Sequence, residues 1–195
     1  MLLWRCTLCR LHLIYWFYIM FLVLGESLID MVEQPDGSFL AVAGGAPYNF
    51  ARAMALQGMA SGYLNPFSSD AFGTMLRDTL LASGAQALGP ITDKPSSLAF
   101  VATDANGQPQ YSFYRSEVAD REIEVSAVHA HTARPGNIGF HTGGLGLVPP
   151  DDQLALAALG RARAGGLVCS VDLNMRPAVA RSLCVEPDQY RGAAL

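Results

Sequence analysis

Residues 39–56 read Phe-Leu-Ala-Val-Ala-Gly-Gly-Ala-Pro-Tyr-Asn-Phe-Ala-Arg-Ala-Met-Ala-Leu, and this stretch decides the fold. An apolar, strand-like run stops at Gly44 and Gly45, and a segment with helical spacing begins directly after them. Adjacent glycines let a backbone approach a ligand closely, and the free N–H groups of a helix start point at the same place. Asn49 lies in the first turn, where its amide could serve the helix end or reach the ligand. The pattern predicts a corner that holds a small polar molecule, although plain turn chemistry gives the same residues.

The composition describes one mildly acidic globular unit. The chain has 195 residues, of which 51% are hydrophobic and 15% charged, and its formal net charge is −4. This length suits one core of ordinary size rather than two domains. The basic residues are scattered, without a Lys/Arg run, so nothing favours binding to nucleic acid.

The four cysteines indicate a reducing compartment. Cys6 and Cys9 form a lone C-x-x-C, far from Cys169 and Cys184. One such pair, without a second pair or a nearby histidine, supplies too few ligands for a structural zinc site. Four cysteines in a chain of this length do not make a disulfide framework. We therefore expect a cytoplasmic location and no metal site in this chain.

Residues 1–24 differ from the rest of the chain, because Arg5 and Arg10 precede a run of apolar and aromatic residues. The run is shorter than the ~20 residues that span a bilayer, and it lacks a small-x-small signal cleavage site. We expect residues 1–19 to be a hydrophobic extension in front of a fold whose first buried strand begins near Phe21. A signal peptide or a membrane anchor is the alternative.

Strands and helices alternate along the chain, joined by short polar segments. The expected elements are a buried strand over 21–32, a strand over 38–43, a helix over 46–57, a strand over 60–64, helices over 70–82 and 151–164, and a strand over 167–173. This alternation predicts a mainly parallel sheet covered by helices. We expect Asp30 in the loop at the end of the first strand, where open α/β sheets bind ligands. A turn or cap role for Asp30 is the alternative.

A hairpin interrupts this alternation. Two β-rich segments, 97–103 and 110–115, are separated by an Asn-Gly dipeptide that is typical of hairpin turns. Together with the strand over 38–43, the hairpin could form a small second sheet that covers the glycine corner. Alternation along a strand puts Tyr111 and Phe113 on one face of this cover.

Two further segments carry polar groups at strand ends. His141 lies in a glycine-rich segment that fails the dinucleotide-binding fingerprint, and we interpret it as a packing residue rather than a ligand. Asp172, Asn174 and Arg176 follow the last expected strand. Such a group is the usual composition of an α/β active site, although Asp172 and Arg176 could simply pair and stiffen the loop.

Five motifs, taken in order, carry a family resemblance: Gly25-Glu-Ser-Leu-Ile-Asp30, Gly44-Gly-Ala-Pro-Tyr-Asn-Phe-Ala51, Ser69-Asp-Ala-Phe-Gly73, Phe113-Tyr-Arg115 and Asp172-Leu-Asn-Met-Arg-Pro177. From about residue 20 to the C-terminus the chain resembles the ribokinase/fructokinase family of sugar kinases, the phosphofructokinase-B type, and most of all its fructokinase-like members. The resemblance implies a three-layer α/β/α fold with a small β-sheet lid. It also implies ATP-dependent phosphorylation of a sugar hydroxyl with Mg²⁺ on the nucleotide, and a possible homodimer formed through the lid.

The resemblance assigns roles on the floor of the sugar site to four residues. Asp30 would accept hydrogen bonds from sugar hydroxyls. Gly44 and Gly45 would let the backbone approach the sugar, and Asn49 would hydrogen-bond to it.

Four more residues would surround the sugar from other sides. Arg115 on the lid would meet the substrate from above, with Tyr114 stacking beside it. Asn174 and Arg176 would lie near the junction of sugar and phosphate, where a cation offsets negative charge.

One departure from the family pattern limits the expected activity. The printed sequence contains no D-T-x-G-A-G-D stretch, which in the family holds the transferring phosphate and supplies the catalytic base, and it contains no N-x-x-E motif. We therefore assign no catalytic residue, and we expect a sugar-binding half, truncated at the C-terminus and inactive alone. The alternatives are a non-catalytic sugar-binding module and a membrane-tethered protein that uses residues 1–24.

Overall fold

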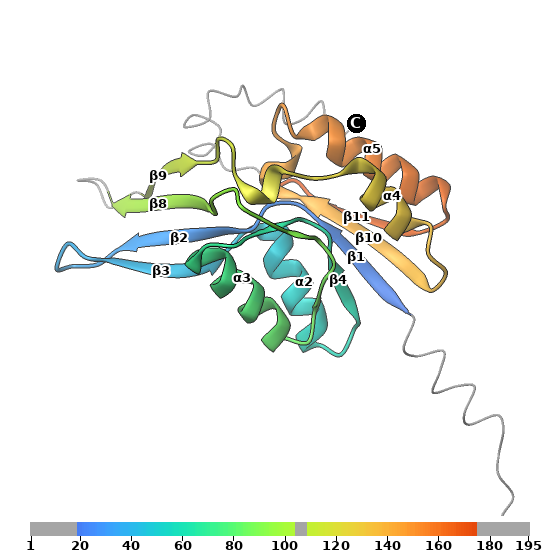
Figure 1. The fold of residues 1–195 in the computed structure, drawn as a ribbon, viewed down its shortest axis with the longest axis horizontal. Coiled ribbons are helices and arrows are strands. Elements are labelled where there is room, and N and C mark those ends of the chain that lie inside the picture. Colours follow the sequence, from blue (N-terminus) through green and yellow to red (C-terminus); the bar gives the residue numbers. More distant parts are fainter. Residues whose placement is uncertain (1–18, 104–108, 175–195) are drawn as a thin grey trace, which may run out of the picture.

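The computed structural model describes residues 19–103 and 109–174. Within them the main sheet is parallel (Figure 1), and its strands follow the order β11 (Val168–Asp172), β10 (Asn137–Gly143), β1 (Met20–Leu24), β4 (Ser61–Tyr63), β6 (Gln86–Ala87). The predicted parallel sheet is confirmed. The expected extension over residues 1–19 lies, except for its last residue, outside the described residues. Within residues 19–103 and 109–174, no helix is long and apolar enough to cross a bilayer.

Helices cover both faces of this sheet (Figure 1). On one face lie α2 (Ala46–Leu56) and α3 (Ala71–Ala82), and on the other α4 (Val125–Thr132) and α5 (Asp152–Ala164). The central strand β1 supplies both cores, since Val23 packs with the α2–α3 side and Leu22 and Leu24 with the α4–α5 side. Period-two alternation in a strand buried on both faces explains this division. The three-layer α/β/α fold is confirmed.

A second sheet forms the lid, in the order β3 (Phe39–Gly44), β2 (Leu28–Glu33), β8 (Ser97–Thr103), β9 (Pro109–Tyr114). The predicted hairpin is confirmed as the antiparallel pair β8–β9. The expected single strand over 21–32 is wrong, because Gly25, at φ 146°, ends β1 and the chain re-enters extended structure in the other sheet. Asp30 consequently lies within β2, opposite Val42 and Ala99, and not in a loop.

Shorter elements complete the described part of the chain. They are the paired strands β5 (Phe67–Ser68) and β7 (Ile91–Thr92), and the 3₁₀ turns η1 (Ala119–Arg121) and η2 (Gly144–Leu147). The sequence analysis missed α4. Asp70 is the N-cap of helix α3, and its Oδ1 accepts a hydrogen bond from the Gly73 N–H at 2.7 Å.

The strand order reverses at β1. After β1 the chain adds β4 and β6 on one side, and later β10 and β11 on the other. In open α/β sheets, the crevice at such a reversal, outside the carboxyl ends of the strands, is where ligands bind. Here the crevice lies between the residues that follow β1 and β10, namely Gly25–Glu26 and Gly144–Leu145.

Candidate functional site

A pocket occupies this crevice, between the carboxyl ends of the main sheet and the inner face of the lid. We call it the switch-point pocket. Its lining consists of Glu26, Leu28, Asp30, Gly45, Ala46, Asn49, Tyr111, Phe113, Gly144, Leu145 and Asn174. Four of the residues expected from the sequence, Asp30, Gly45, Asn49 and Asn174, therefore share one cavity.

Gly44 supports the pocket by allowing Asp30 its position. A Cβ at Gly44 would collide with the Asp30 Oδ2 atom, so a larger residue there would displace the carboxylate. Gly45 has φ 111°, a left-handed conformation that disfavours side chains, and it precedes the first turn of α2. The glycine pair thus serves as a turn and gives room to Asp30 and to the backbone of Glu26, and the close approach to a ligand stays a prediction.

Asn49 and Asn174 enter the pocket from different elements. The Asn49 N–H donates to the Gly45 carbonyl at 2.9 Å in the first turn of α2, and Arg52 Nη1 donates to Asn49 Oδ1 at 3.3 Å. Asn174 follows β11 with φ 41°, and its N–H donates to Asp172 Oδ1 at 2.9 Å. Arg176, and with it the alternative Asp172–Arg176 pair, lies outside the described residues.

The aromatic wall of the pocket comes from β9. Tyr111 and Phe113 lie on one face of the strand, as alternation predicted, with stacked rings 5.9 Å apart. The assignment of Tyr114 to the pocket is wrong. Tyr114 lies on the opposite lid face, is 60% exposed and packs edge-on against Phe100.

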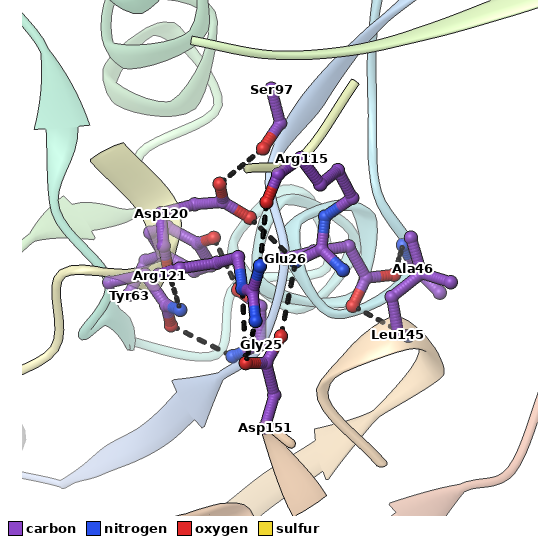
Figure 2. Close-up of polar contacts among 11 residues, drawn as sticks. Gly25, Glu26, Ala46, Tyr63, Ser97, Arg115, Asp120, Arg121, Leu145 and Asp151 are labelled. Atoms are coloured by element: carbon purple, nitrogen blue, oxygen red, sulfur yellow. Dashed lines mark hydrogen bonds and ion pairs between the residues drawn. The ribbon is translucent and has the colours of Figure 1, made fainter. Parts of the chain in front are cut away.

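Glu26 is the site residue that the sequence analysis missed, although it stands in one of the quoted motifs. The side chain is buried, and Figure 2 shows it between the starts of α2 and η2, where Oε1 accepts the Ala46 N–H at 3.1 Å and Oε2 accepts the Leu145 N–H at 3.0 Å. Burial raises the pKa of Glu26 to about 7, while the charge of Arg115 and hydrogen bonds from backbone N–H groups limit the rise. A charged residue directly after a buried strand and a glycine was the available signal.

Arg115 does not reach the switch-point pocket, so the expectation that it meets a substrate from above is wrong. Its side chain is only 10% exposed and forms ion pairs with Asp120 at 3.1 Å and Asp151 at 3.8 Å (Figure 2). Arg121 donates to the same Asp151 carboxylate at 2.7 Å. These carboxylates hold Arg115 behind Glu26. There Arg115 lines a second cavity, which we call the rear cavity, together with Glu26, Asn65, Asp120, Arg121 and Asp151.

Two buried side chains fix the turn that carries Glu26. Asn65 Oδ1 accepts the Gly25 N–H at 2.8 Å, while its Nδ2 donates to the Asp120 carbonyl at 2.9 Å. The Tyr63 hydroxyl donates to the Gly25 carbonyl at 2.5 Å. Both polar groups of Gly25 are thereby satisfied inside the protein, which keeps the carboxyl end of β1 in one conformation.

His141 is confirmed as a packing residue. Its ring stacks on Phe50 at 3.7 Å, and Nδ1 lies 3.1 Å from Ser170 Oγ. Burial lowers the pKa of His141 to about 4, so the ring is neutral at physiological pH. Among the described residues, no three His, Cys, Asp or Glu side chains are grouped so that they could hold a metal ion.

Comparison with known proteins shows which family the chain is similar to. The profile of the pfkB family carbohydrate kinases matches residues 20–186. Fructokinase-2 of Oryza sativa subsp. japonica is 35% identical over 162 residues, which are 78% of this chain and 48% of that protein. The chain thus spans about half the length of the curated relatives it matches.

Solved structures agree with the fold. The fructokinase of Xylella fastidiosa, solved with bound ATP, superposes with a TM-score of 0.76 at 32% identity, over 89% of this chain and 54% of that one. A putative ribokinase II from E. coli reaches 0.72 at 21% identity, over 90% of this chain and 58% of that one, which shows the shared fold alone. The chain belongs to the pfkB family of carbohydrate kinases.

Proposed function

We propose that the switch-point pocket binds a hexose of the fructose type, and that this chain supplies the sugar-binding half of an ATP-dependent sugar kinase. The observation that carries the proposal is the convergence of Asp30, Asn49 and the aromatic pair Tyr111–Phe113 on one cavity at the reversal of strand order. Family membership supports the reaction class, and the names of the 31–35% identical relatives support fructose.

The residues of the pocket suit a polyol. The Asp30 carboxylate accepts hydrogen bonds from sugar hydroxyls, and the Asn49 amide adds donors or an acceptor. Charge-assisted hydrogen bonds of this kind are about twice as strong as neutral ones. The aromatic faces of Tyr111 and Phe113 cover the C–H surface of the sugar, while the backbone at Gly45, Ala46, Gly144 and Leu145 lines the opposite side of the pocket.

The phosphoryl donor proposed is ATP with Mg²⁺, since the Xylella relative was solved with ATP. Among the described residues no three His, Cys, Asp or Glu side chains are grouped to hold a metal ion directly, so Mg²⁺ would be carried by the nucleotide phosphates. The printed sequence also lacks the D-T-x-G-A-G-D stretch that would position phosphate and base. We therefore expect sugar binding without phosphoryl transfer from the 195-residue chain alone.

The lid is the proposed contact in a homodimer. Its pocket-side face exposes Leu40 (56%) and Val42 (40%), on the same side of the sheet as Asp30. Covering such side chains favours association through the hydrophobic effect. We place the protein in the cytoplasm, because its few cysteines suit a reducing compartment.

Calorimetric titration of the full 195-residue chain with D-fructose tests the function. We expect saturable heat with fructose, and no sugar phosphate when ATP and Mg²⁺ are added. The absence of binding with fructose or any other hexose would contradict the sugar site. Turnover by this chain alone would contradict its proposed dependence on the missing motif.

A further inference from the structure

Glu26 joins two walls of the switch-point pocket that are far apart in sequence. Its two carboxyl oxygens accept the N–H groups of Ala46 and Leu145, and both of these residues line the pocket. Ala46 opens helix α2, and Leu145 belongs to η2. A single side chain therefore sets the separation of the two backbone segments between which a ligand would lie.

The surrounding backbone is shaped to admit this carboxylate. Gly144 has φ 58°, and a Cβ there would collide with the Glu26 carboxyl oxygens. A Cβ on Gly45 would collide with the Glu26 carbonyl oxygen. Gly144 thus leaves room for the carboxylate of Glu26, and Gly45 leaves room for its backbone.

Glu26 is also the one residue common to the linings of the switch-point pocket and the rear cavity among the described residues. On the rear side it interacts electrostatically with Arg115, which follows the last residue of lid strand β9. Arg115 is held in turn by Asp120, whose carboxylate accepts a hydrogen bond from the hydroxyl of Ser97 at the start of lid strand β8. The bases of two lid strands therefore converge on the guanidinium that faces Glu26 (Figure 2).

We propose that Glu26 is a positioning residue of the sugar pocket: its ionised carboxylate clamps α2 to η2, and Arg115 at the base of the lid favours that ionised form. The proposal rests on the proposed sugar-binding function. Ionisation matters because a carboxylate offers both oxygens as acceptors, whereas a protonated carboxyl turns one of them into a donor. A protonated Glu26 leaves one of the two N–H groups poorly satisfied, and the clamp loosens.

The charges around Glu26 place this change near neutral pH. Burial raises the pKa of Glu26 to about 7, Arg115 opposes the rise, and Asp120 adds to it. The other titratable groups of the buried cluster are Tyr63 on β4, Arg121 in η1 and Asp151 before α5. Sugar affinity should therefore fall as the pH drops through about 7, because the clamped form is the ionised one.

The first measurement needs no variant. In the full chain, the Glu26 side-chain carboxyl carbon and the backbone amides of Ala46 and Leu145 are followed by NMR between about pH 5 and 9. We expect the three signals to share one midpoint near pH 7. Amides of Ala46 and Leu145 that do not follow the titration of the Glu26 carboxyl would overturn the proposal whether or not sugar binds.

The second measurement links the clamp to the ligand. Calorimetry with D-fructose should show affinity that weakens at low pH in the wild type, and a Glu26→Gln variant that binds about tenfold more weakly at high pH without that pH dependence. Glu33→Gln, which removes an exposed carboxylate at the end of the following strand β2, should behave as the wild type. Pocket binding that is equally strong at all pH values, or unaffected in Glu26→Gln, would overturn the positioning role.

The third measurement tests Arg115. Arg115→Met should move the NMR midpoint to higher pH, and Arg115→Lys should return it towards the wild-type value, because the lysine restores the charge. An unchanged midpoint in both variants would contradict the role of Arg115. If Arg115→Met does not fold, Arg115→Lys is compared with the wild type alone. Because this variant keeps the charge, a strong shift of its NMR midpoint would contradict the electrostatic role of Arg115.

Discussion

Behind the switch-point pocket lies an ion-pair network, formed by Arg115, Arg121, Asp120 and Asp151. The pocket and this network both contain buried or half-buried carboxylates, but these carboxylates have different surroundings. Asp30 stands on the inner face of the lid, where it lines the pocket and lies close to Gly44. Asp120 and Asp151 are instead occupied by arginines and by the chain itself. The difference teaches that proximity to the crevice does not make a charged group a binding group. Asp30 lines the switch-point pocket, whereas Asp120 and Asp151 form ion pairs behind it.

The largest expected effect comes from breaking the network. Asp120→Ala removes the closest partner of a buried guanidinium, so we expect the free energy of unfolding to fall by about 3–5 kcal/mol in urea titrations. The matched control is Glu117→Ala, which breaks the exposed ion pair with Lys94 and should leave the urea midpoint unchanged. Equal effects of the two variants would erase the distinction between the regions.

Glu26, which borders both regions, should make stability depend on pH. In the unfolded chain its carboxyl ionises near pH 4.5, whereas the folded protein retains the proton until about pH 7. Because the folded state then binds more protons, this contribution is complete below pH 4.5 and is lost as the pH rises through 7, by about 3 kcal/mol. The loss should be absent in Glu26→Gln, and parallel stability profiles for wild type and variant would contradict the assignment.

A change in the pocket should affect binding but not stability. Asp30→Asn replaces the charged acceptor by a neutral amide of the same shape, so we expect fructose affinity to fall about tenfold to a hundredfold in calorimetry, with an unchanged urea midpoint. Asp78→Asn, on an exposed position of α3, serves as the control and should bind as the wild type. A loss of stability without a loss of affinity would assign Asp30 to the structure instead.

The smallest effect separates the two faces of β9. Tyr111→Ala removes part of the aromatic wall and should weaken fructose binding about fivefold, in keeping with the loss of one apolar contact. Tyr114→Ala, three residues further along the strand and facing away, should leave the affinity unchanged. The reverse ranking in the same calorimetric series would restore the role for Tyr114 that the family resemblance implied.

Local patterns predicted much of the fold and part of the site. The alternation of strands and helices, the glycine corner and the placement of Tyr111 and Phe113 on one face all follow from short-range periodicity, and the structure confirms them. The strand-end pattern also singled out Asp30, which the structure places in the pocket lining although on a strand rather than in a loop.

The errors arose where distant segments decide the outcome. Arg115 forms ion pairs with Asp120, which lies in η1, and with Asp151, which lies beyond another helix and strand, so it does not line the pocket. Glu26 gains its role from two backbone N–H groups that are 20 and 119 residues away. Neither partner set has a periodic signature, so composition and spacing could not reveal it.

A map of amide chemical-shift changes on adding D-fructose to the full chain tests the central claim most directly. The account predicts saturable changes at Gly45, Ala46 and Asn49 around the switch-point pocket, with those at the exposed Asp78 on α3 unchanged. Changes confined to residues away from this pocket, or none at saturating fructose, would contradict it.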